Sequence, residues 1–438
     1  MDDTIFPVDL AATGWPLVLL GAAALALVLT VLVALSTLKD LRSPLAALVG
    51  VTAGFQTAQI ASVHMFCPAV LLWLVFGVWR EPRGRWHPKW PLVVMACVAL
   101  LASTAMTGQM VNSKLVAIQL VLLAGTGACL VAFGDQQDAR SALGGLLLIT
   151  TVACVAALAQ YAGVLPYKIY LGTHRPIGLY SEPDWLGMFS AVGLLLAFRA
   201  TNLGRWRTPL VFLHVIVLLL AAARAAWIGV VVVAALGWVV ARLMRKSGSV
   251  PAGPKLGGWR MAVGGVLVVI VALMVSPSLR ESLTDRVTGA VGSRPEVGAM
   301  ARQKQNASLL ELNSQAPPVG LGLSASGRVG VSGRIAYMGN SVNNVASNWL
   351  LGWWVDGGVL SLPLIGLFFF AAARRLTVTH GLLLGVVLAC SFFSNAMVIP
   401  IAWFALALCL IEPARAPEPA PVGPPNPPVR AGVAVTAG

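Results

Sequence analysis

The sequence predicts an all-α protein, a polytopic transmembrane helical bundle of about 12–13 helices with one large extracytoplasmic loop. Two observations predict this fold. Of the 438 residues, 58% are hydrophobic and only 11% are charged, against roughly 25% charged residues in an ordinary soluble domain. The apolar residues also gather in long runs, which short basic connectors separate. A soluble fold of this composition would leave large apolar surfaces in water, so a membrane is the expected surroundings.

The predicted helices follow the apolar runs in order. Several runs are shorter than the ~20 residues that cross a bilayer upright. Residues 209–240 are long enough for two short helices that turn near Arg224. The runs are 15–38, 44–62, 65–79, 91–108, 115–133, 141–163, 185–198, 209–222, 226–241, 261–276, 347–371, 380–394 and 396–411.

The basic residues between these runs set the orientation, because short connectors rich in Lys and Arg stay in the cytoplasm. This assignment places residues 164–184 and the long loop 277–346 on the extracytoplasmic side, where binding or catalysis is expected. The net charge of +14 then reflects topology, and nucleic-acid binding is not expected. The connectors contain Lys39, Arg42, Arg80, Arg83, Arg85, Lys89, Arg199, Arg205, Arg207, Arg242, Arg245, Lys246, Lys255, Arg260, Arg374 and Arg375.

Residues 1–412 are predicted to form a single transmembrane domain, and residues 413–438 a disordered cytoplasmic tail rich in Pro and Ala. Acidic residues precede the first run, unlike the basic start of a cleavable signal, so the first helix is expected to be retained. The cysteines lie inside apolar runs without the spacing of a metal site or a disulfide framework, which indicates small buried apolar residues. They are Cys67, Cys97, Cys129, Cys154, Cys390 and Cys409.

Arg224 interrupts the apolar run LLLAAARAAWIGVVVV without an acidic neighbour in sequence. A charge at the centre of a membrane helix costs roughly 2.5–3.5 kcal/mol on insertion scales. One interpretation is a turn at the outer surface, with the side chain reaching the headgroups. The other is an anion site for a lipid-linked phosphate. Arginine suits such a site because its planar fork donates two parallel hydrogen bonds and stays ionised.

The first outer loop contains THRPIGLYSEPDWLGMF, in which basic and acidic residues precede a helix. Arg175 is a candidate phosphate ligand. Asp184 is either a ligand or an acid that caps the following helix, where the helix dipole favours negative charge. His174 is either an exposed loop histidine or a general base.

The long outer loop carries an excess of arginine against the positive-inside bias, which favours an anionic ligand; the alternative for each charge is a solvated surface. Its middle predicts a short amphipathic helix that ends at Pro317 and Pro318 and is followed by a Gly-rich turn. That turn lacks the Lys-Ser or Lys-Thr ending of a nucleotide loop. The basic residues are Arg280, Arg286, Arg294, Arg302, Lys304, Arg328 and Arg334.

The next segment, SNWLLGWWVDGGVLSLPLIG, begins a helix that Ser347 is expected to cap. Asp356 lies within the apolar run and is expected to pair with an arginine; the alternative is a position among the headgroups. The tryptophans at 349, 353 and 354 fit an interfacial belt or a stacking surface for sugar rings.

Four short motifs follow one another between residues 141 and 411. The first has the form R-x-x-G-x-x-x-x-P-D-x-x-G, and the second is Ala223-Arg224 in a helical hairpin. The third is an arginine on an amphipathic helix before Pro and Gly-x-Gly, and the fourth is Ser-Asn-x-x-Leu with a later Gly. Their residues are Arg175, Gly178, Pro183, Asp184, Gly187, Ala223, Arg224, Arg302, Leu309, Leu310, Pro318, Gly320, Gly322, Ser347, Asn348, Leu351 and Gly358.

In this order the motifs resemble the O-antigen ligase and polymerase superfamily of bacterial membrane glycosyltransferases. The family has Asn where Asp184 stands, Ser at position 223, and His at position 347. The resemblance implies an enzyme of the bacterial cytoplasmic membrane with its site on the extracytoplasmic side. Such an enzyme transfers a glycan from a polyprenyl-pyrophosphate carrier to an acceptor hydroxyl of a glycan or lipid during surface polysaccharide assembly. It is surrounded by membrane lipids and is expected to need no metal or cofactor.

The resemblance also implies roles for individual residues. Arginines replace a metal in stabilising the pyrophosphate leaving group, with Arg224 and Arg302 as the main candidates and Arg175 and Arg286 in support. Asp184 and Asn348 are further candidates for substrate binding. Because Ser347 replaces the family histidine, acceptor activation falls to His174, Asp356 or Ser347, or is lost. Two other functions remain open at this stage: a lipid-linked oligosaccharide flippase or transporter, and a non-catalytic assembly scaffold.

Overall fold

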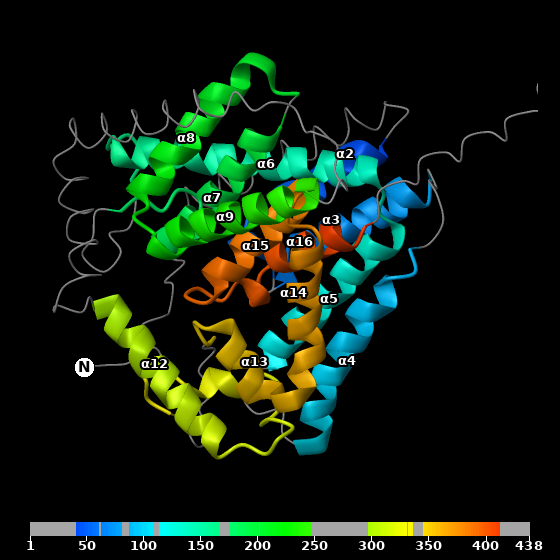
Figure 1. Cartoon of the computed structure of the whole chain (residues 1–438), viewed down its shortest axis with the longest axis vertical. Coiled ribbons are helices and arrows are strands. Elements are labelled where there is room, and N and C mark those ends of the chain that lie inside the picture. The colour runs from blue at the N-terminus through cyan, green and yellow to red at the C-terminus, as the bar shows by residue number, and fades with distance from the viewer. Residues whose placement is uncertain are drawn as a thin grey trace, which may run out of the picture.

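The computed structural model describes residues 41–60, 63–80, 87–107, 114–166, 175–200, 202–246, 297–330, 332–335 and 345–411. In these ranges the chain is mostly helical, with one short antiparallel pair, β1 (Gln59–Ile60) and β2 (Val63–His64). The helices in Figure 1 are α2 (Arg42–Ala53), α3 (Phe66–Leu72), α4 (Trp90–Thr107), α5 (Lys114–Phe133), α6 (Gln136–Tyr161), α7 (Pro183–Arg199), α8 (Arg207–Leu220), α9 (Arg224–Lys246), α12 (Val297–Ser314), α13 (Trp349–Gly357), α14 (Leu362–Arg374), α15 (Thr379–Ser391) and α16 (Pro400–Leu410).

Within the described ranges, five helical segments are long and apolar enough to cross a membrane, by length and composition alone. This confirms the helical part of the prediction and is compatible with a multi-pass membrane protein. The predicted runs 15–38 and 261–276 and the predicted tail 413–438 lie outside the described residues. The five segments are Trp90–Thr107, Val116–Phe133, Gln136–Tyr161, Arg224–Met244 and Trp349–Arg374.

Two predicted runs are divided in the structure. The run 44–62 is not one helix, because α2 ends at Ala53 and the chain turns at Gly54 before entering the β1–β2 pair. The run 347–371 is divided where α13 ends at Gly357. Gly358 there has φ 49°, a left-handed conformation that glycine adopts without steric cost.

The predicted hairpin near Arg224 is confirmed. Helix α8 ends at Leu220, and α9 begins at Arg224. The predicted amphipathic helix of the long loop is α12, and the chain reaches the glycines of the predicted turn a few residues after it ends at Ser314.

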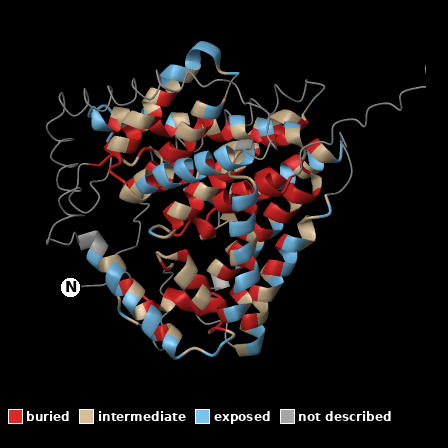
Figure 2. Ribbon diagram, in the orientation of Figure 1, coloured by how far each residue is buried: buried red, intermediate tan, exposed pale blue. Residues whose placement is uncertain are grey.

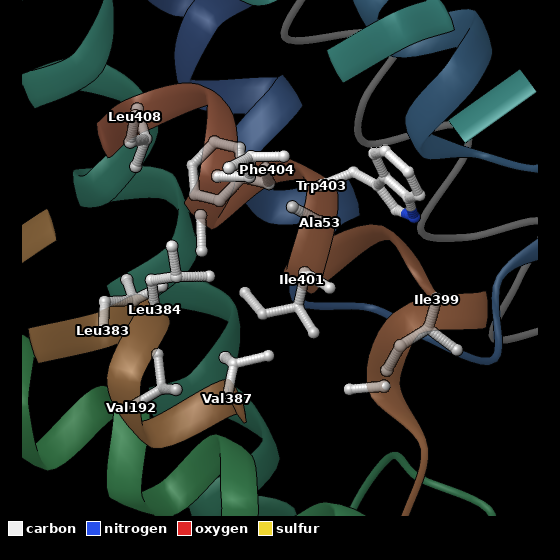
Figure 3. Packing of buried hydrophobic residues seen from close by; sticks show 14 of the residues in the cluster. Ala53, Val192, Leu383, Leu384, Val387, Ile399, Ile401, Trp403, Phe404 and Leu408 are labelled. Carbon is white, nitrogen blue, oxygen red and sulfur yellow. The ribbon is translucent and has the colours of Figure 1, made fainter. Parts of the chain in front are cut away.

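Helix α16 forms the centre of the hydrophobic core, and all its residues are buried. Figure 3 shows its side chains Ile401 and Phe404 among those of neighbouring helices, including Val192 from α7 and Leu384 and Val387 from α15. An apolar helix buried on every side needs neighbours all around it. Helices α2, α5, α14 and α15 provide these neighbours.

Small residues let α2 and α6 pack at backbone distance. A Cβ atom added at Gly50 would lie 1.7 Å from the carbonyl oxygen of Ala142, and one added at Gly145 would lie 1.9 Å from that of Ala47. Larger side chains at these positions would force the two helices apart, as at other close crossings of membrane helices.

Helix α9 has two unlike faces. A Cβ added at Gly229 would lie 3.3 Å from Ala389 of α15, so the small-residue face of α9 packs against that helix. Ile228, Val231 and Trp238 are more than half exposed, and Figure 2 shows exposed residues along α9 and α4. Exposed apolar faces of this kind are suited to contact with lipid.

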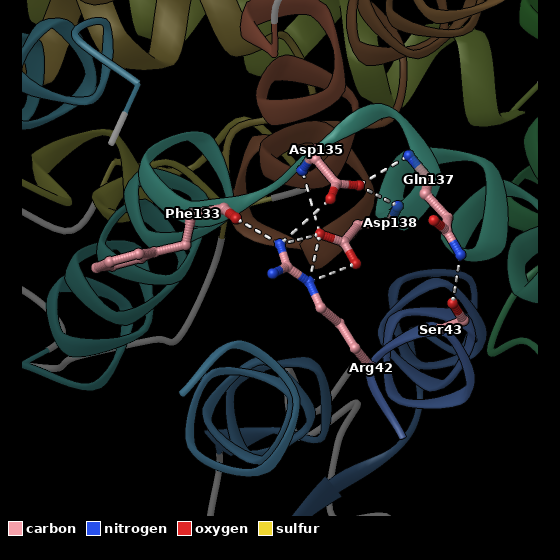
Figure 4. Close-up of polar contacts among 6 residues, drawn as sticks. All are labelled: Arg42, Ser43, Phe133, Asp135, Gln137 and Asp138. Carbon is pink, nitrogen blue, oxygen red and sulfur yellow. Dashed lines mark hydrogen bonds and ion pairs between the residues drawn. The ribbon is translucent and has the colours of Figure 1, made fainter. Parts of the chain in front are cut away.

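A buried ion pair joins the start of α2 to the start of α6 (Figure 4). The Arg42 side chain is fully buried, and its Nη2 donates to Asp138 Oδ2 at 2.6 Å and to the carbonyl oxygen of Phe133 at 2.9 Å. Asp135 caps α6 and lies 3.6 Å from the same Nη2 atom. The two acids and the carbonyl group thus compensate the buried guanidinium.

A second, smaller core lies apart from the main one. It joins α12, the 3-10 turn η3 (Ala325–Arg328) and α13, which appear in yellow and gold in the lower part of Figure 1. The apolar face of α12 is thereby buried in this second core, not against the helices around α16. The members of this core are Leu309, Leu312, Ala325, Val329, Ala346 and Val355.

Candidate functional site

The segment between α6 and α7 is held by Gln160, near the end of α6. Its Oε1 accepts hydrogen bonds from the backbone N–H groups of Ile177 (3.1 Å) and Gly178 (2.8 Å), and its Nε2 donates to the Gly178 carbonyl at 3.0 Å. Gly178 has φ 61°, and an added Cβ would lie 2.7 Å from the carbonyl oxygen of Ala153. Glycine is therefore required at this turn, which fixes the backbone between Arg175 and α7.

The carboxylate of Asp184 connects two arginines from distant parts of the chain. Arg175 Nη2 donates to Asp184 Oδ1 at 2.8 Å, and Arg302 Nη2, from α12, donates to Asp184 Oδ2. The Asp184 side chain is 22% exposed, that of Arg302 is 35% exposed and that of Arg175 only 9%. The structure therefore brings together Arg175, Asp184 and Arg302, which the sequence singled out in two separate loops.

The two arginines also control the ionisation of Asp184. Burial alone would raise the pKa of its carboxyl, but the guanidinium groups of Arg175 and Arg302 outweigh burial and hold this pKa below its ordinary value. Asp184 is consequently ionised throughout the neutral range. It lies in the first turn of α7, where the helix dipole also favours a carboxylate.

The break between α8 and α9 lies against the same site. Arg175 Nε donates to the carbonyl oxygen of Ala221 at 2.7 Å. A Cβ atom added at Gly187 of α7 would lie 2.3 Å from the Cβ atom of Ala223. Ala222, between them, has φ 48°, an uncommon left-handed conformation for a residue other than glycine. Arg224 follows as the first residue of α9, three residues after the carbonyl group that Arg175 binds.

Ser347 lies next to α12, the helix that carries Arg302. Gln305, one turn after Arg302 on α12, accepts a hydrogen bond from the Ser347 backbone N–H at 3.0 Å and donates to the Val329 carbonyl at 3.2 Å. Residues three apart share a helix face. Ser347 thus lies beside the Arg302 face of α12.

Two expectations about the following helix are corrected. The N-cap of α13 is Asn348, not Ser347, because Asn348 Oδ1 accepts from the N–H groups of Leu350 (3.1 Å) and Leu351 (3.3 Å). Asn348 is therefore occupied in capping the helix. The Ser347 backbone is instead held by Gln305.

The expectation that Asp356 pairs with an arginine is also wrong within the described residues. Its two carboxylate oxygens accept from the backbone N–H groups of Ser324 (2.9 Å) and Ser326 (2.7 Å). Ser324 has φ 64°, which turns these N–H groups toward the acid. Asp356 is 5% exposed, and within the described residues its place is that of an anchor for the Gly-rich turn.

His174 and Arg286, the other predicted site residues, lie outside the described residues. Sequence reasoning missed Gln160 and Gln305, both of which bind backbone groups. The available signals were weak: a glutamine near the end of an apolar run, and a second polar residue one turn after Arg302.

Across the described ranges, no three His, Cys, Asp or Glu side chains are grouped as metal ligands would be. No protein-family model, curated protein or solved structure matches the chain. What the site can do is therefore argued from its geometry: it presents guanidinium groups, one of them partly exposed, to an anion.

Proposed function

We propose that the chain is a membrane glycosyltransferase of O-antigen ligase or polymerase type. It moves a glycan from a polyprenyl-pyrophosphate carrier to an acceptor hydroxyl during assembly of a surface polysaccharide. One observation carries the proposal: the Asp184 carboxylate joins Arg175 and Arg302 from separate segments, and Arg175 also donates to the Ala221 carbonyl, three residues before Arg224. Clustered arginines beside exposed apolar helices suit a phosphate that is attached to a lipid.

The reaction requires stabilisation of a departing pyrophosphate. The acceptor oxygen attacks the anomeric carbon, its bond to that carbon forms, and the bond from carbon to the pyrophosphate oxygen breaks. The electron pair leaves with the pyrophosphate, whose negative charge grows in the transition state. Arg302 and Arg224, supported by Arg175, are proposed to bind that charge, as preorganised donors do at other developing anions.

The proton of the acceptor hydroxyl must pass to a base. Asp356 is a poor candidate, because both its oxygens are held by backbone N–H groups. Ser347 lies beside Gln305 of α12, but its hydroxyl is not basic at neutral pH. A general base contributes roughly 10²–10⁴-fold, so slow transfer is expected unless His174 fills the role.

The contacts between connectors support an extracytoplasmic position for the site. Arg175, Asp184 and Arg302 all belong to loops that the distribution of basic residues assigns to the outside. Conversely, Arg199 Nη2 donates to the Thr377 carbonyl at 2.7 Å, and both lie in connectors assigned to the cytoplasm. A consistent topology requires that connectors in contact lie on the same side of the membrane, and both sets of contacts meet this requirement.

Reconstitution in liposomes tests the proposal. The purified protein is supplied with polyprenyl-pyrophosphate oligosaccharide and acceptor glycan, and product size is followed. Transfer is expected with the unaltered protein and should fall at least about tenfold in Arg302→Lys, because lysine lacks the planar fork. Lys304→Ala is the matched control, since it removes an exposed charge two residues away on the same helix.

The outcomes separate the rival functions. A ladder of products would indicate a polymerase, and a single step would indicate a ligase. Movement of an unchanged donor across the bilayer would contradict the proposal in favour of a transporter. Failure of transfer with every acceptor, even after Ser347→His, would favour a scaffold.

A further inference from the structure

Arg175 and Arg302 are held in unlike ways. Arg175 is buried and bound at two points, by Asp184 through Nη2 and by the Ala221 carbonyl through Nε. Its loop is also fixed by Gln160. The Arg175 guanidinium is thus part of the rigid framework and cannot turn without breaking contacts with two helices.

Arg302 is held much more loosely. Among the described residues, its guanidinium donates to Asp184 Oδ2 alone, and its side chain is about one-third exposed. The helix that carries it packs into the small core with Leu309 and Leu312 at its far end, apart from the core around α16. The Arg302 guanidinium can therefore exchange partners at little structural cost.

Asp184 occupies the position that an anionic ligand would take between the two guanidinium groups. A carboxylate and a phosphate present similar pairs of oxygens to an arginine fork. The carboxylate lowers the net charge of the two arginines from +2 to +1. It therefore preserves their arrangement in the empty protein while weakening their attraction for an anion.

We infer that Asp184 is a positioning residue that acts as an internal competitor, and that an incoming pyrophosphate group takes Arg302 from Asp184 while Arg175 stays in place. This inference rests on the proposed function, because it assumes that the arginines bind the pyrophosphate of the donor. Its consequence is specific: loss of the carboxylate strengthens pyrophosphate binding, whereas loss of Arg302 weakens it.

The test measures the Kd of inorganic pyrophosphate for the full chain in lipid nanodiscs. Asp184→Asn is expected to bind about fivefold more tightly, since a partly exposed charge pair is worth about 1 kcal/mol. The asparagine oxygen can still accept from Arg175, but its NH₂ group cannot accept from Arg302. In an Arg302→Ala background the gain should fall below about twofold.

Two variants control for charge and folding. Asp135→Asn makes the same change in net charge and retains a good N-cap residue. It lies at the start of α6, and the 26 residues of that helix, about 39 Å long, separate it from the end that holds the site loop; its Kd should be unchanged. Asp184→Glu keeps the charge and should not bind pyrophosphate more tightly than the unaltered protein. If Asp184→Asn does not fold, Asp184→Ser removes the same charge and should shift Kd in the same direction.

The outcomes distinguish this inference from the proposed function. Equal or weaker binding by Asp184→Asn, together with weaker binding by Arg302→Ala, would overturn the competitor role and leave the arginine clamp standing. Absence of pyrophosphate binding by the unaltered protein, with no effect of Arg302→Ala, would overturn both.

Discussion

Replacing Asp138 with Ala is expected to lower the free energy of unfolding by about 3–5 kcal/mol, because it leaves the Arg42 guanidinium buried without its closest counter-ion. Arg42 Nε lies 3.0 Å and 3.1 Å from the two Asp138 oxygens, and Nη2 lies 2.6 Å from Oδ2. The Arg42 side chain is fully buried and that of Asp138 is 5% exposed. Water therefore cannot replace the lost contacts.

The remaining contacts set the magnitude within that range. The Phe133 carbonyl at 2.9 Å and Asp135 at 3.6 Å still face Nη2 after the change, so the cost should lie toward the lower end. Asp135→Asn, which removes the more distant and 30% exposed acid, should cost less than about 1 kcal/mol. Replacing both members of the pair, with Arg42→Met and Asp138→Leu, should come within about 2 kcal/mol of the unaltered protein.

The assay is equilibrium unfolding in mixed detergent micelles, with helix content as the signal. The unaltered protein, Arg42→Met, Asp138→Leu and the double variant form a thermodynamic cycle, and the coupling between Arg42 and Asp138 is the difference between the double change and the sum of the single ones. A loss of less than about 1 kcal/mol in Asp138→Ala would refute the reasoning, since a buried guanidinium that loses its closest counter-ion must cost more than an exposed one.

Gly193→Ala is expected to cost about 1–3 kcal/mol of stability by overpacking, because the added Cβ would lie 2.1 Å from Cε1 of the fully buried His214. Gly144→Ala on α6, which meets nothing within 4 Å, is its thermal-unfolding control, and an equal loss in both variants would contradict the packing argument. Gly178→Ala should reduce glycan transfer at least about tenfold, because a Cβ would meet the Ala153 carbonyl at 2.7 Å in a left-handed backbone and shift the adjoining site loop. Full transfer by a stably folded Gly178→Ala protein would show that this turn does not position the site.

The apolar runs predicted the positions of many described helices, and five helical segments are long and apolar enough to cross a membrane, by length and composition. The hairpin at Arg224 and the amphipathic α12 were predicted from other signals. A charge interrupts the apolar pattern at Arg224, and prolines follow the helical pattern of α12. The division of the run 44–62 was missed. Its apolar residues continue past Gly54, and the pairing of β1 with β2 depends on neighbours that hydropathy does not register.

The polar partners were harder to predict than the helices. Asp356 was expected to pair with an arginine, yet it binds the N–H groups of Ser324 and Ser326. Gln160 and Gln305 were not singled out at all, and they too bind backbone groups. Backbone donors and acceptors occur at almost every residue, so no side-chain pattern in the sequence reveals which of them will face a buried polar group.

Asp184 shows why a distant contact changes the interpretation of a local motif. From its loop alone, helix capping and ligand binding were both open, because an acid in the first turn of α7 satisfies either. Arg302, 118 residues further along the chain, adds a partner that the loop does not contain. A purely structural salt bridge would be weakened by loss of either the carboxylate or the guanidinium, and pyrophosphate affinity would not rise. Opposite effects of Asp184→Asn and Arg302→Ala on that affinity, with the gain lost in the Arg302→Ala background, are expected if the pair competes with an anion for the same arginine fork.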